Sequence, residues 1–139
     1  EAQPDAIVDI ATLTGAVEIA LGNKIAGLMG NNVAWVDQVS TAADRAGERV
    51  WPLPLPADYH ERIESDVADL RNIGKGRGAG TITAGLFLQD FVADGIPWAH
   101  LDIAAVAWSD ASAGENAVGG TGWGVRTLLE LVSTFKKPR

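Results

Sequence analysis

The residues best suited to bind a ligand are Thr12-Leu13-Thr14-Gly15, which follow the apolar run Ala6–Val8. A β-branched apolar run is typical of a parallel strand covered on both faces. The polar turn after it lies at the carboxyl end of the strand, where open α/β sheets bind their ligands. One acid, Asp9, stands in the apolar segment, and it needs partners because burying an unpaired carboxylate is costly.

A second segment has the same character. Trp98–Ala107 is apolar, is interrupted by Asp102, and shares Asp-Ile-Ala with the first segment. The shared stretch is too short to indicate an internal repeat. It favours two neighbouring strands of one sheet, whose ends line one site. Two core strands, each with a satisfied aspartate and no site, are the alternative.

A third segment, Arg71–Gly80, is rich in glycine and carries Arg71, Lys75 and Arg77 in an otherwise acidic chain. A basic glycine-rich loop before a helix can bind an anion through backbone amides and the helix dipole. The spacing matches neither the P-loop nor the dinucleotide fingerprint. An exposed loop without a ligand is the equally weighted alternative.

Composition narrows the class of protein. The chain has 139 residues, 47% of them hydrophobic and 21% charged, which is typical of one globular domain with its own core. It has no cysteine and only two histidines, His60 and His100, so thiolate and histidine-rich metal sites are excluded within it. A net charge of -7 disfavours nucleic acid as a partner. No apolar stretch is long enough for a membrane span, and no secretory signal is visible.

The pattern of the chain predicts alternating strands and helices, which indicates a layered α/β fold. The opening Glu1-Ala2-Gln3 leads almost directly into a strand, so we expect a segment of a longer protein, with a processed N-terminus as the alternative. Trp51–Pro56 is expected to be an irregular extended crossing, and Trp108–Gly122 a long loop. Strands are predicted at Ala6–Leu13, Lys24–Gly30, Trp98–Ala107 and, as a short piece, Val67–Leu70; helices at Gly15–Leu21, Val33–Arg49, Pro56–Ser65, Thr81–Val92 and Trp123–Phe135.

Taken together, four segments resemble the C-terminal half of the catalytic domain of the leucyl aminopeptidase (cytosol aminopeptidase) family. The resemblance runs from Pro4 to about Val132 and is specific in combination, although each segment alone is weak. The segments are Asp9–Ala16, Asn72–Gly74 with its glycine loop, Ala79–Leu88 and Trp98–Ala104.

The resemblance implies a layered α/β/α fold with a mixed, mostly parallel sheet. Residues 1–139 would be one C-terminal segment of the catalytic domain, without the N-terminal domain and the metal-ligand segment. The parent protein would be a cytoplasmic metallo-aminopeptidase that removes N-terminal residues from peptides. Two divalent ions, manganese or zinc, would activate a water molecule and polarise the scissile carbonyl. Members are typically homohexamers.

Residue by residue, the resemblance implies walls of a substrate pocket. Thr12, Leu13 and Gly15 would border the substrate, with the backbone of the last two bonding the peptide. Ile73 would line the pocket for the residue after the scissile bond. Ala104 and Ala107 would line the pocket for the N-terminal side chain, and the small Ala107 would widen it.

The resemblance also implies what this chain lacks. The metal ligands, two lysines and the Asn-Thr-Asp-Ala-Glu-Gly-Arg signature of the family all precede its first residue. We therefore expect no catalytic residue and no metal ligand here, structural roles for Asp9, Asp102 and His100, and no peptidase activity from the chain alone. Two other functions stay open: an anion-binding module built on Arg71, Lys75 and Arg77, and an interaction or oligomerisation module using Trp51–Pro56 and Trp108–Gly122.

Overall fold

A four-stranded sheet organises the computed structural model, which describes residues 3–138. The strands lie in the order β1 (Ile7–Ala11), β4 (Trp98–Asp102), β2 (Ala26–Gly30) and β3 (Val50–Pro52). β1 pairs with β4 and β2 with β3 in parallel, whereas β2 and β4 are antiparallel. The mixed, mostly parallel sheet that the sequence predicted is therefore confirmed.

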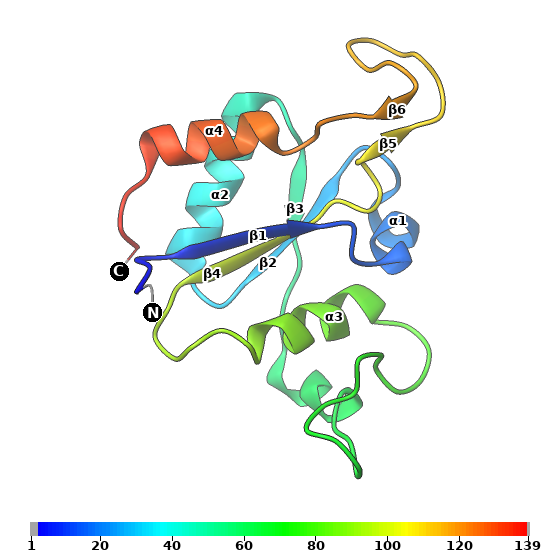
Figure 1. Ribbon diagram of the computed structural model, residues 1–139, viewed down its shortest axis with the longest axis vertical. Coiled ribbons are helices and arrows are strands. Elements are labelled where there is room, and N and C mark those ends of the chain that lie inside the picture. The colour runs from blue at the N-terminus through cyan, green and yellow to red at the C-terminus, as the bar shows by residue number, and fades with distance from the viewer. Residues whose placement is uncertain (1–2, 139) are drawn as a thin grey trace.

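Helices cover both faces of this sheet (Figure 1). One face packs against α2 (Val33–Ala46) and α4 (Val125–Thr134), and the other against α1 (Gly15–Leu21) and α3 (Gly80–Gln89). Alternation along the strands separates the two faces, because neighbouring side chains point in opposite directions. The core under α2 and α4 consists of Leu28, Trp35, Val39, Ala42, Ala99, Leu101 and Leu131.

Side-chain caps fix where two of the helices begin. The hydroxyl of Thr14 accepts the Val17 N–H at 3.1 Å and starts α1 directly after the first strand. Asn32 accepts the Trp35 N–H at 2.9 Å and starts α2 in the same way. Gly47, in the left-handed region, ends α2 three residues before the predicted boundary at Arg49.

Several predicted elements are wrong in detail. Trp51–Pro56 is not wholly irregular, because Trp51 and Pro52 belong to β3 at the edge of the sheet, where proline costs no ladder bond. The helix predicted at Pro56–Ser65 is a 3-10 helix, η1 (Ala57–Arg62). The short strand or extended piece predicted at Val67–Leu70 is not a strand, and residues 67–69 form bends. The predicted boundaries of β1, β2, α3 and α4 each extended one to three residues too far at an end.

The largest correction concerns the segment after β4. The predicted strand Trp98–Ala107 ends at Asp102, and a tight turn follows, in which the N–H groups of Val106 and Ala107 both bond to the Ile103 carbonyl. The predicted loop Trp108–Gly122 contains a small hairpin of β5 (Trp108–Ser109) and β6 (Gly119–Gly120).

Within residues 3–138, no helix is long and apolar enough to cross a bilayer.

Candidate functional site

The carboxyl ends of β1 and β4 lie side by side and bring two sequence motifs together. Ala11 pairs with Asp102 in the parallel ladder, and the Ile103 N–H bonds to the Ala11 carbonyl at 2.9 Å. The turn Thr12–Gly15 therefore adjoins the turn Ile103–Ala107. The echo between the two Asp-Ile-Ala segments reflects neighbouring strands, as the sequence predicted.

The carboxylate of Asp102 holds both turns in shape. Its Oδ1 accepts the N–H groups of Leu13 at 3.1 Å, Thr14 at 3.3 Å and Ala104 at 3.3 Å. Its Oδ2 accepts the Thr14 hydroxyl at 2.6 Å. The side chain is fully buried, so these bonds compensate the cost of removing a carboxylate from water.

The first turn of α3 joins the same network. The hydroxyls of Thr14 and Thr81 lie 3.0 Å apart, so Thr14 links the end of β1 to α3. Gly80 permits this approach, because a Cβ there would come within 3.0 Å of the Ala16 Cβ. Three of the motifs found in the sequence thus meet around Asp102.

The turn Thr12–Gly15 presents backbone and side-chain atoms to solvent. Thr12 and Gly15 are exposed, Leu13 is 39% exposed, and no atom lies within 4 Å of the place a Cβ on Gly15 would take. Because Asp102 accepts the Leu13 N–H, Leu13 can offer a ligand only its carbonyl oxygen. The N–H of Gly15, at the first helical position, has no intrahelical acceptor and can donate.

Ile73 lies in the glycine-rich loop that precedes α3. The side chain is 84% exposed, and the neighbouring Gly74 packs closely against Thr83, one turn beyond the start of the helix. The loop is anchored by Arg62, whose guanidinium donates to the Gly78 carbonyl at 2.8 Å and whose own carbonyl accepts the Lys75 N–H. The loop that carries Ile73 therefore packs on α3, which lies on the same face of the sheet as α1.

The three cations of this loop, Arg71, Lys75 and Arg77, are all exposed. The loop meets α3 through Ala79, which adopts a left-handed backbone with φ of 55° and makes no side-chain cap. Arg62, a cation outside the predicted set, is the one that bonds to the loop carbonyls.

The Asp9 carboxylate has two hydrogen-bonding partners, Trp98 and His100. Its Oδ2 accepts the Trp98 indole N–H at 2.6 Å, and its Oδ1 lies 2.5 Å from Nδ1 of the fully buried His100. The rings of Trp98 and His100 stack. Nowhere in residues 3–138 do three or more His, Cys, Asp or Glu side chains gather in a way that could hold a metal ion.

A groove of about 790 Å³ lies beside the paired strand ends. It runs between the β5–β6 hairpin and the body of the molecule, and its walls include Ala104, Trp108, Trp123 and Arg126. Of the residues predicted to border the substrate, Ala104 lines this groove, whereas Thr12, Leu13 and Gly15 do not. The groove therefore lies next to the turn Thr12–Gly15 and does not include it.

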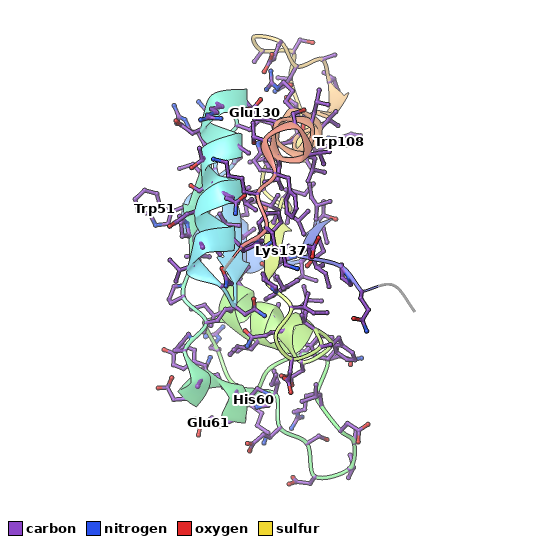
Figure 2. All side chains as sticks on the ribbon, turned by 90° about the vertical axis from the view of Figure 1, so that its left-hand side faces the viewer. Trp51, His60, Glu61, Trp108, Glu130 and Lys137 are labelled. Atoms are coloured by element: carbon purple, nitrogen blue, oxygen red, sulfur yellow. The ribbon has the colours of Figure 1, made fainter. Side chains whose placement is uncertain are left out.

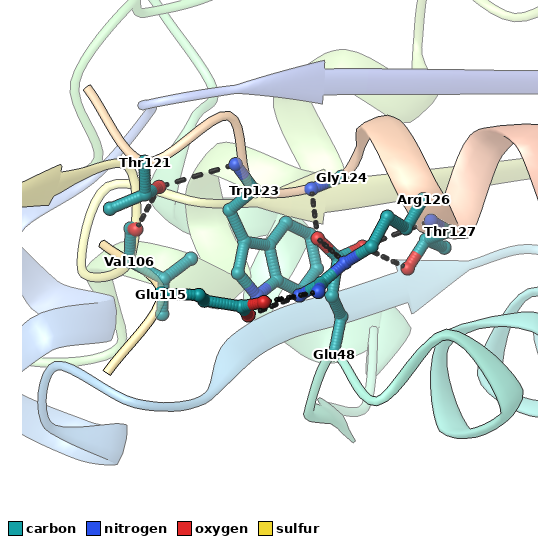
Figure 3. A network of polar contacts seen from close by, with 8 residues as sticks. All are labelled: Glu48, Val106, Glu115, Thr121, Trp123, Gly124, Arg126 and Thr127. Carbon is teal, nitrogen blue, oxygen red and sulfur yellow. Dashed lines mark hydrogen bonds and ion pairs between the residues drawn. The ribbon is translucent and has the colours of Figure 1, made fainter. Parts of the chain in front are cut away.

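A charged network of Glu48, Glu115 and Arg126, drawn in Figure 3, contributes to the lining of this groove. The buried carboxylate of Glu48 accepts the N–H groups of Gly124 at 3.0 Å and Thr127 at 2.9 Å, and the Thr127 hydroxyl at 2.6 Å. It thereby caps α4 from 76 and 79 residues away. Glu48 could not be recognised from the sequence, because its only local signal is a charged residue just after a helix.

Arg126 connects this cap to the hairpin. Its two terminal nitrogens each donate to a Glu115 carboxylate oxygen at 2.8 Å, and its Nε lies 3.6 Å from Glu48. The hydrogen bond and the positive charge of Arg126 lower the pKa of Glu115, and Glu115 in turn raises the pKa of Arg126.

Comparison with known proteins identifies the family of this chain. Residues 1–129 match the model of the cytosol aminopeptidase family, catalytic domain. The chain belongs to the cytosol aminopeptidase family. It is 53% identical over 132 residues to a probable cytosol aminopeptidase of Parasynechococcus marenigrum, covering 95% of this chain and 27% of that protein. A relative from Syntrophobacter fumaroxidans is 52% identical over 129 residues, which are 93% of this chain and 25% of the relative.

Solved structures agree with this family assignment. The bottromycin maturation enzyme BotP superposes with a TM-score of 0.88 at 46% identity, covering 94% of this chain and 29% of BotP. A mutant of tomato leucine aminopeptidase gives a TM-score of 0.84 at 43% identity, covering 92% of this chain and 24% of that enzyme. The resemblance found in the sequence is therefore confirmed. The chain spans about a quarter of the length of the relatives it matches.

Proposed function

We propose that this chain forms one wall of the substrate site of a leucyl-type metallo-aminopeptidase, which removes N-terminal residues from peptides. The observation that supports this most strongly is the junction of three family motifs at Asp102, Thr14 and Thr81. The junction leaves an exposed backbone turn at the carboxyl ends of β1 and β4. This is the edge of an α/β sheet at which ligands bind.

In this proposal, the turn Thr12–Gly15 orients the peptide by backbone hydrogen bonds. The Leu13 carbonyl accepts an N–H of the substrate, since the Leu13 N–H is already bonded to Asp102. The Gly15 N–H donates to a substrate carbonyl, and Thr12 borders the bound chain. Fixing the substrate on a rigid turn converts binding energy into correct orientation of the scissile bond.

The predicted side-chain pockets fit on either side of this turn. Ala104 and Ala107 lie on the turn after β4, and their small side chains leave room for the N-terminal side chain of the substrate. Ile73 presents an exposed apolar side chain above α3, where it can contact the residue after the scissile bond.

Two divalent ions would supply a nucleophilic water and polarise the scissile carbonyl. BotP has been solved in complex with Mn, which supports manganese ahead of zinc for this family member as well. The described residues do not fit a metal site, because no cluster of suitable side chains occurs among them. In this proposal, the metal ligands belong to protein outside this chain, and Asp9 and Asp102 serve as structural acids.

The described surface supports association with further protein. β1 has β4 as its one partner in the described sheet, and an unpaired strand edge invites another strand. On α4, the side chains of Val125, Leu129 and Val132 are each more than 65% exposed and lie on one helix face. We propose that the remaining part of the catalytic domain, within a cytoplasmic homohexamer, covers these surfaces.

The alternative modules have less support. Arg71, Lys75 and Arg77 lie exposed on a loop that belongs to the family fold, so the loop needs no anion to explain it. Trp51 and Trp108 do project into solvent from the two interaction segments (Figure 2). Both segments lie within the family match, so their exposure is consistent with contacts inside a larger enzyme.

The proposal is tested by assaying two proteins on leucine p-nitroanilide with Mn²⁺. One is this chain alone, and the other is the full-length protein that the proposal implies. We expect hydrolysis by the full-length protein and none by the chain alone, because the proposal assigns the metal ligands to protein outside the chain. Hydrolysis by the chain alone, with metal bound in stoichiometric amount, would contradict the assignment of the ligands to the remainder.

A further inference from the structure

The turn that carries Ala104 and Ala107 is held from two directions. On one side it continues from β4, and the Ala104 N–H bonds to Asp102. On the other side, the Ala107 carbonyl accepts the Thr121 N–H at 3.0 Å, and the Val106 carbonyl accepts the Thr121 hydroxyl at 2.8 Å. The position of Ala107 therefore depends on the strand that leaves the β5–β6 hairpin.

The hairpin has few other attachments to the body of the molecule. β5 and β6 are two residues each, and most of the residues between them are exposed. Left-handed glycines at Gly114, Gly119 and Gly122 give the segment a backbone that bends easily. A weakly packed segment of this kind needs a specific contact to hold one position.

The Glu115–Arg126 pair supplies that contact. Both hydrogen bonds are 2.8 Å long, and the paired geometry of a guanidinium and a carboxylate fixes direction as well as distance. Arg126 stands at the start of α4, where it is also 3.6 Å from the buried carboxylate of Glu48. Figure 3 shows the resulting line of contacts, which runs from Glu115 to the cap of α4.

The groove connects this pair to the substrate pocket. Glu115, Arg126 and Ala104 all line it. We propose that the Glu115–Arg126 ion pair sets which N-terminal side chains the pocket accepts, by fixing the hairpin that is tied to Ala107. This inference rests on the proposed function, since it assigns Ala104 and Ala107 to the pocket wall. Arg126 is thus a positioning residue without contact to the substrate.

The first test measures the structural link on this chain alone, by amide hydrogen exchange. Glu115→Gln and Arg126→Gln should each speed exchange of the Thr121 N–H about threefold or more, because the hairpin is released. Arg126→Lys should show a smaller change, since it keeps the charge and loses the paired geometry. Arg45→Gln, which removes the 3.4 Å pair between Arg45 and Glu130, is the matched control and should leave Thr121 unaffected. Unchanged exchange in all variants would overturn the inference.

The second test uses the full-length protein and compares kcat/KM for leucine and alanine p-nitroanilides. The leucine-to-alanine ratio should change about threefold or more in Glu115→Gln and Arg126→Gln, because one misplaced wall alters contact with a branched side chain. The double variant should change it no further than Arg126→Gln. If the variants are active and their leucine-to-alanine ratio equals that of the wild type, this inference is overturned and the proposed function stands. A wild type that hydrolyses neither substrate would overturn the proposed function, and the inference with it.

Discussion

The Thr14 hydroxyl donates a hydrogen bond of 2.6 Å to Oδ2 of Asp102, which lies 88 residues later in the chain. This bond makes the turn after β1 depend on the end of β4. Neither turn can change shape alone, because Asp102 also accepts the N–H groups of Leu13 and Ala104. A substrate that binds to this turn thus meets a surface organised before it arrives.

We first predict that Asp102→Asn destabilises the chain. The variant keeps the size of the side chain but replaces one acceptor oxygen by an NH₂ group that faces N–H and O–H donors. The expected loss in the free energy of unfolding is about 2–4 kcal/mol, measured by urea denaturation. Asp110→Asn is the control, because Asp110 is exposed and accepts a hydrogen bond from the indole of the exposed Trp108. Equal stability of the two variants would show that Asp102 does not hold the turn.

We next predict that Thr14 and Thr81 are energetically coupled. Their hydroxyls are 3.0 Å apart, and Thr81 is 5% exposed. In a double-mutant cycle with Thr14→Val and Thr81→Val, which both remove the hydroxyl, the coupling should be about 0.5–1.5 kcal/mol, read from unfolding free energies. Thr14→Ser, which keeps the hydroxyl that caps α1, is the control and should retain most of this coupling. Strict additivity would mean that α3 is positioned by packing alone.

Gly15→Ala should weaken substrate binding without destabilising the fold. A Cβ at this position meets no atom within 4 Å, and alanine suits a helix better than glycine, so the melting temperature should be unchanged or raised. In the full-length protein, KM for leucine p-nitroanilide should rise about tenfold or more, because the new methyl group stands where the peptide lies.

Two variants control the Gly15 experiment. Ile19→Ala changes a 91% exposed side chain on the same helix and should alter neither stability nor KM. Gly30→Ala should unfold the chain, because its Cβ would overlap the Trp98 carbonyl oxygen. An unchanged KM in Gly15→Ala would remove Gly15 from the proposed site.

Glu48→Gln should weaken the attachment of α4. The variant loses a charged acceptor from three buried hydrogen bonds and leaves Arg126 without its second partner. We expect a loss of about 2–4 kcal/mol in the free energy of unfolding, measured by denaturant. Glu130→Gln, on the outer part of α4, should cost less than about 1 kcal/mol. Equal losses would contradict the capping role of Glu48.

The anchor of the hairpin should depend on pH. Arg126 lowers the pKa of Glu115 in the folded chain below its ordinary value of 4.5. A lowered folded pKa means that the pair stabilises the fold above pH 4.5, and that this contribution is lost as the pH falls through the folded pKa. The difference in melting temperature between wild type and Glu115→Gln should therefore vanish in acid, and high salt should reduce it at pH 7. A difference that persists at low pH would point to packing instead.

Much of the fold could be predicted because its signals are local. The helix at Gly15–Leu21 was predicted with its observed limits, since Thr14 and Gly22 mark both ends in the sequence. β3 was missed because its formation depends on the free edge of β2 rather than on Trp51 and Pro52 themselves. β4 was predicted too long, because the apolar run continues beyond Asp102 into a turn that this carboxylate creates.

The candidate site was predicted from motifs and their resemblance, and the structure adds what no local pattern contains. The meeting of Thr12–Gly15 with Ala104 follows from strand pairing over about 90 residues. The charged network was missed for the same reason, since Glu48 and Thr127 are 79 residues apart and neither belongs to a motif. The roles of Thr12, Leu13, Gly15, Ile73, Ala104 and Ala107 in binding remain predictions.

The pairing of β1 with β4 has a consequence for synthesis on the ribosome. His100 and its partner Asp9 are 91 residues apart, so β1 emerges long before the strand that completes it. At about 5–20 residues per second, the apolar segment Ile7–Ala11 waits roughly 5–20 seconds for its partner. During this interval it is a strand edge open to wrong pairing. The nascent chain should thus depend on chaperone protection until β4 has left the exit tunnel.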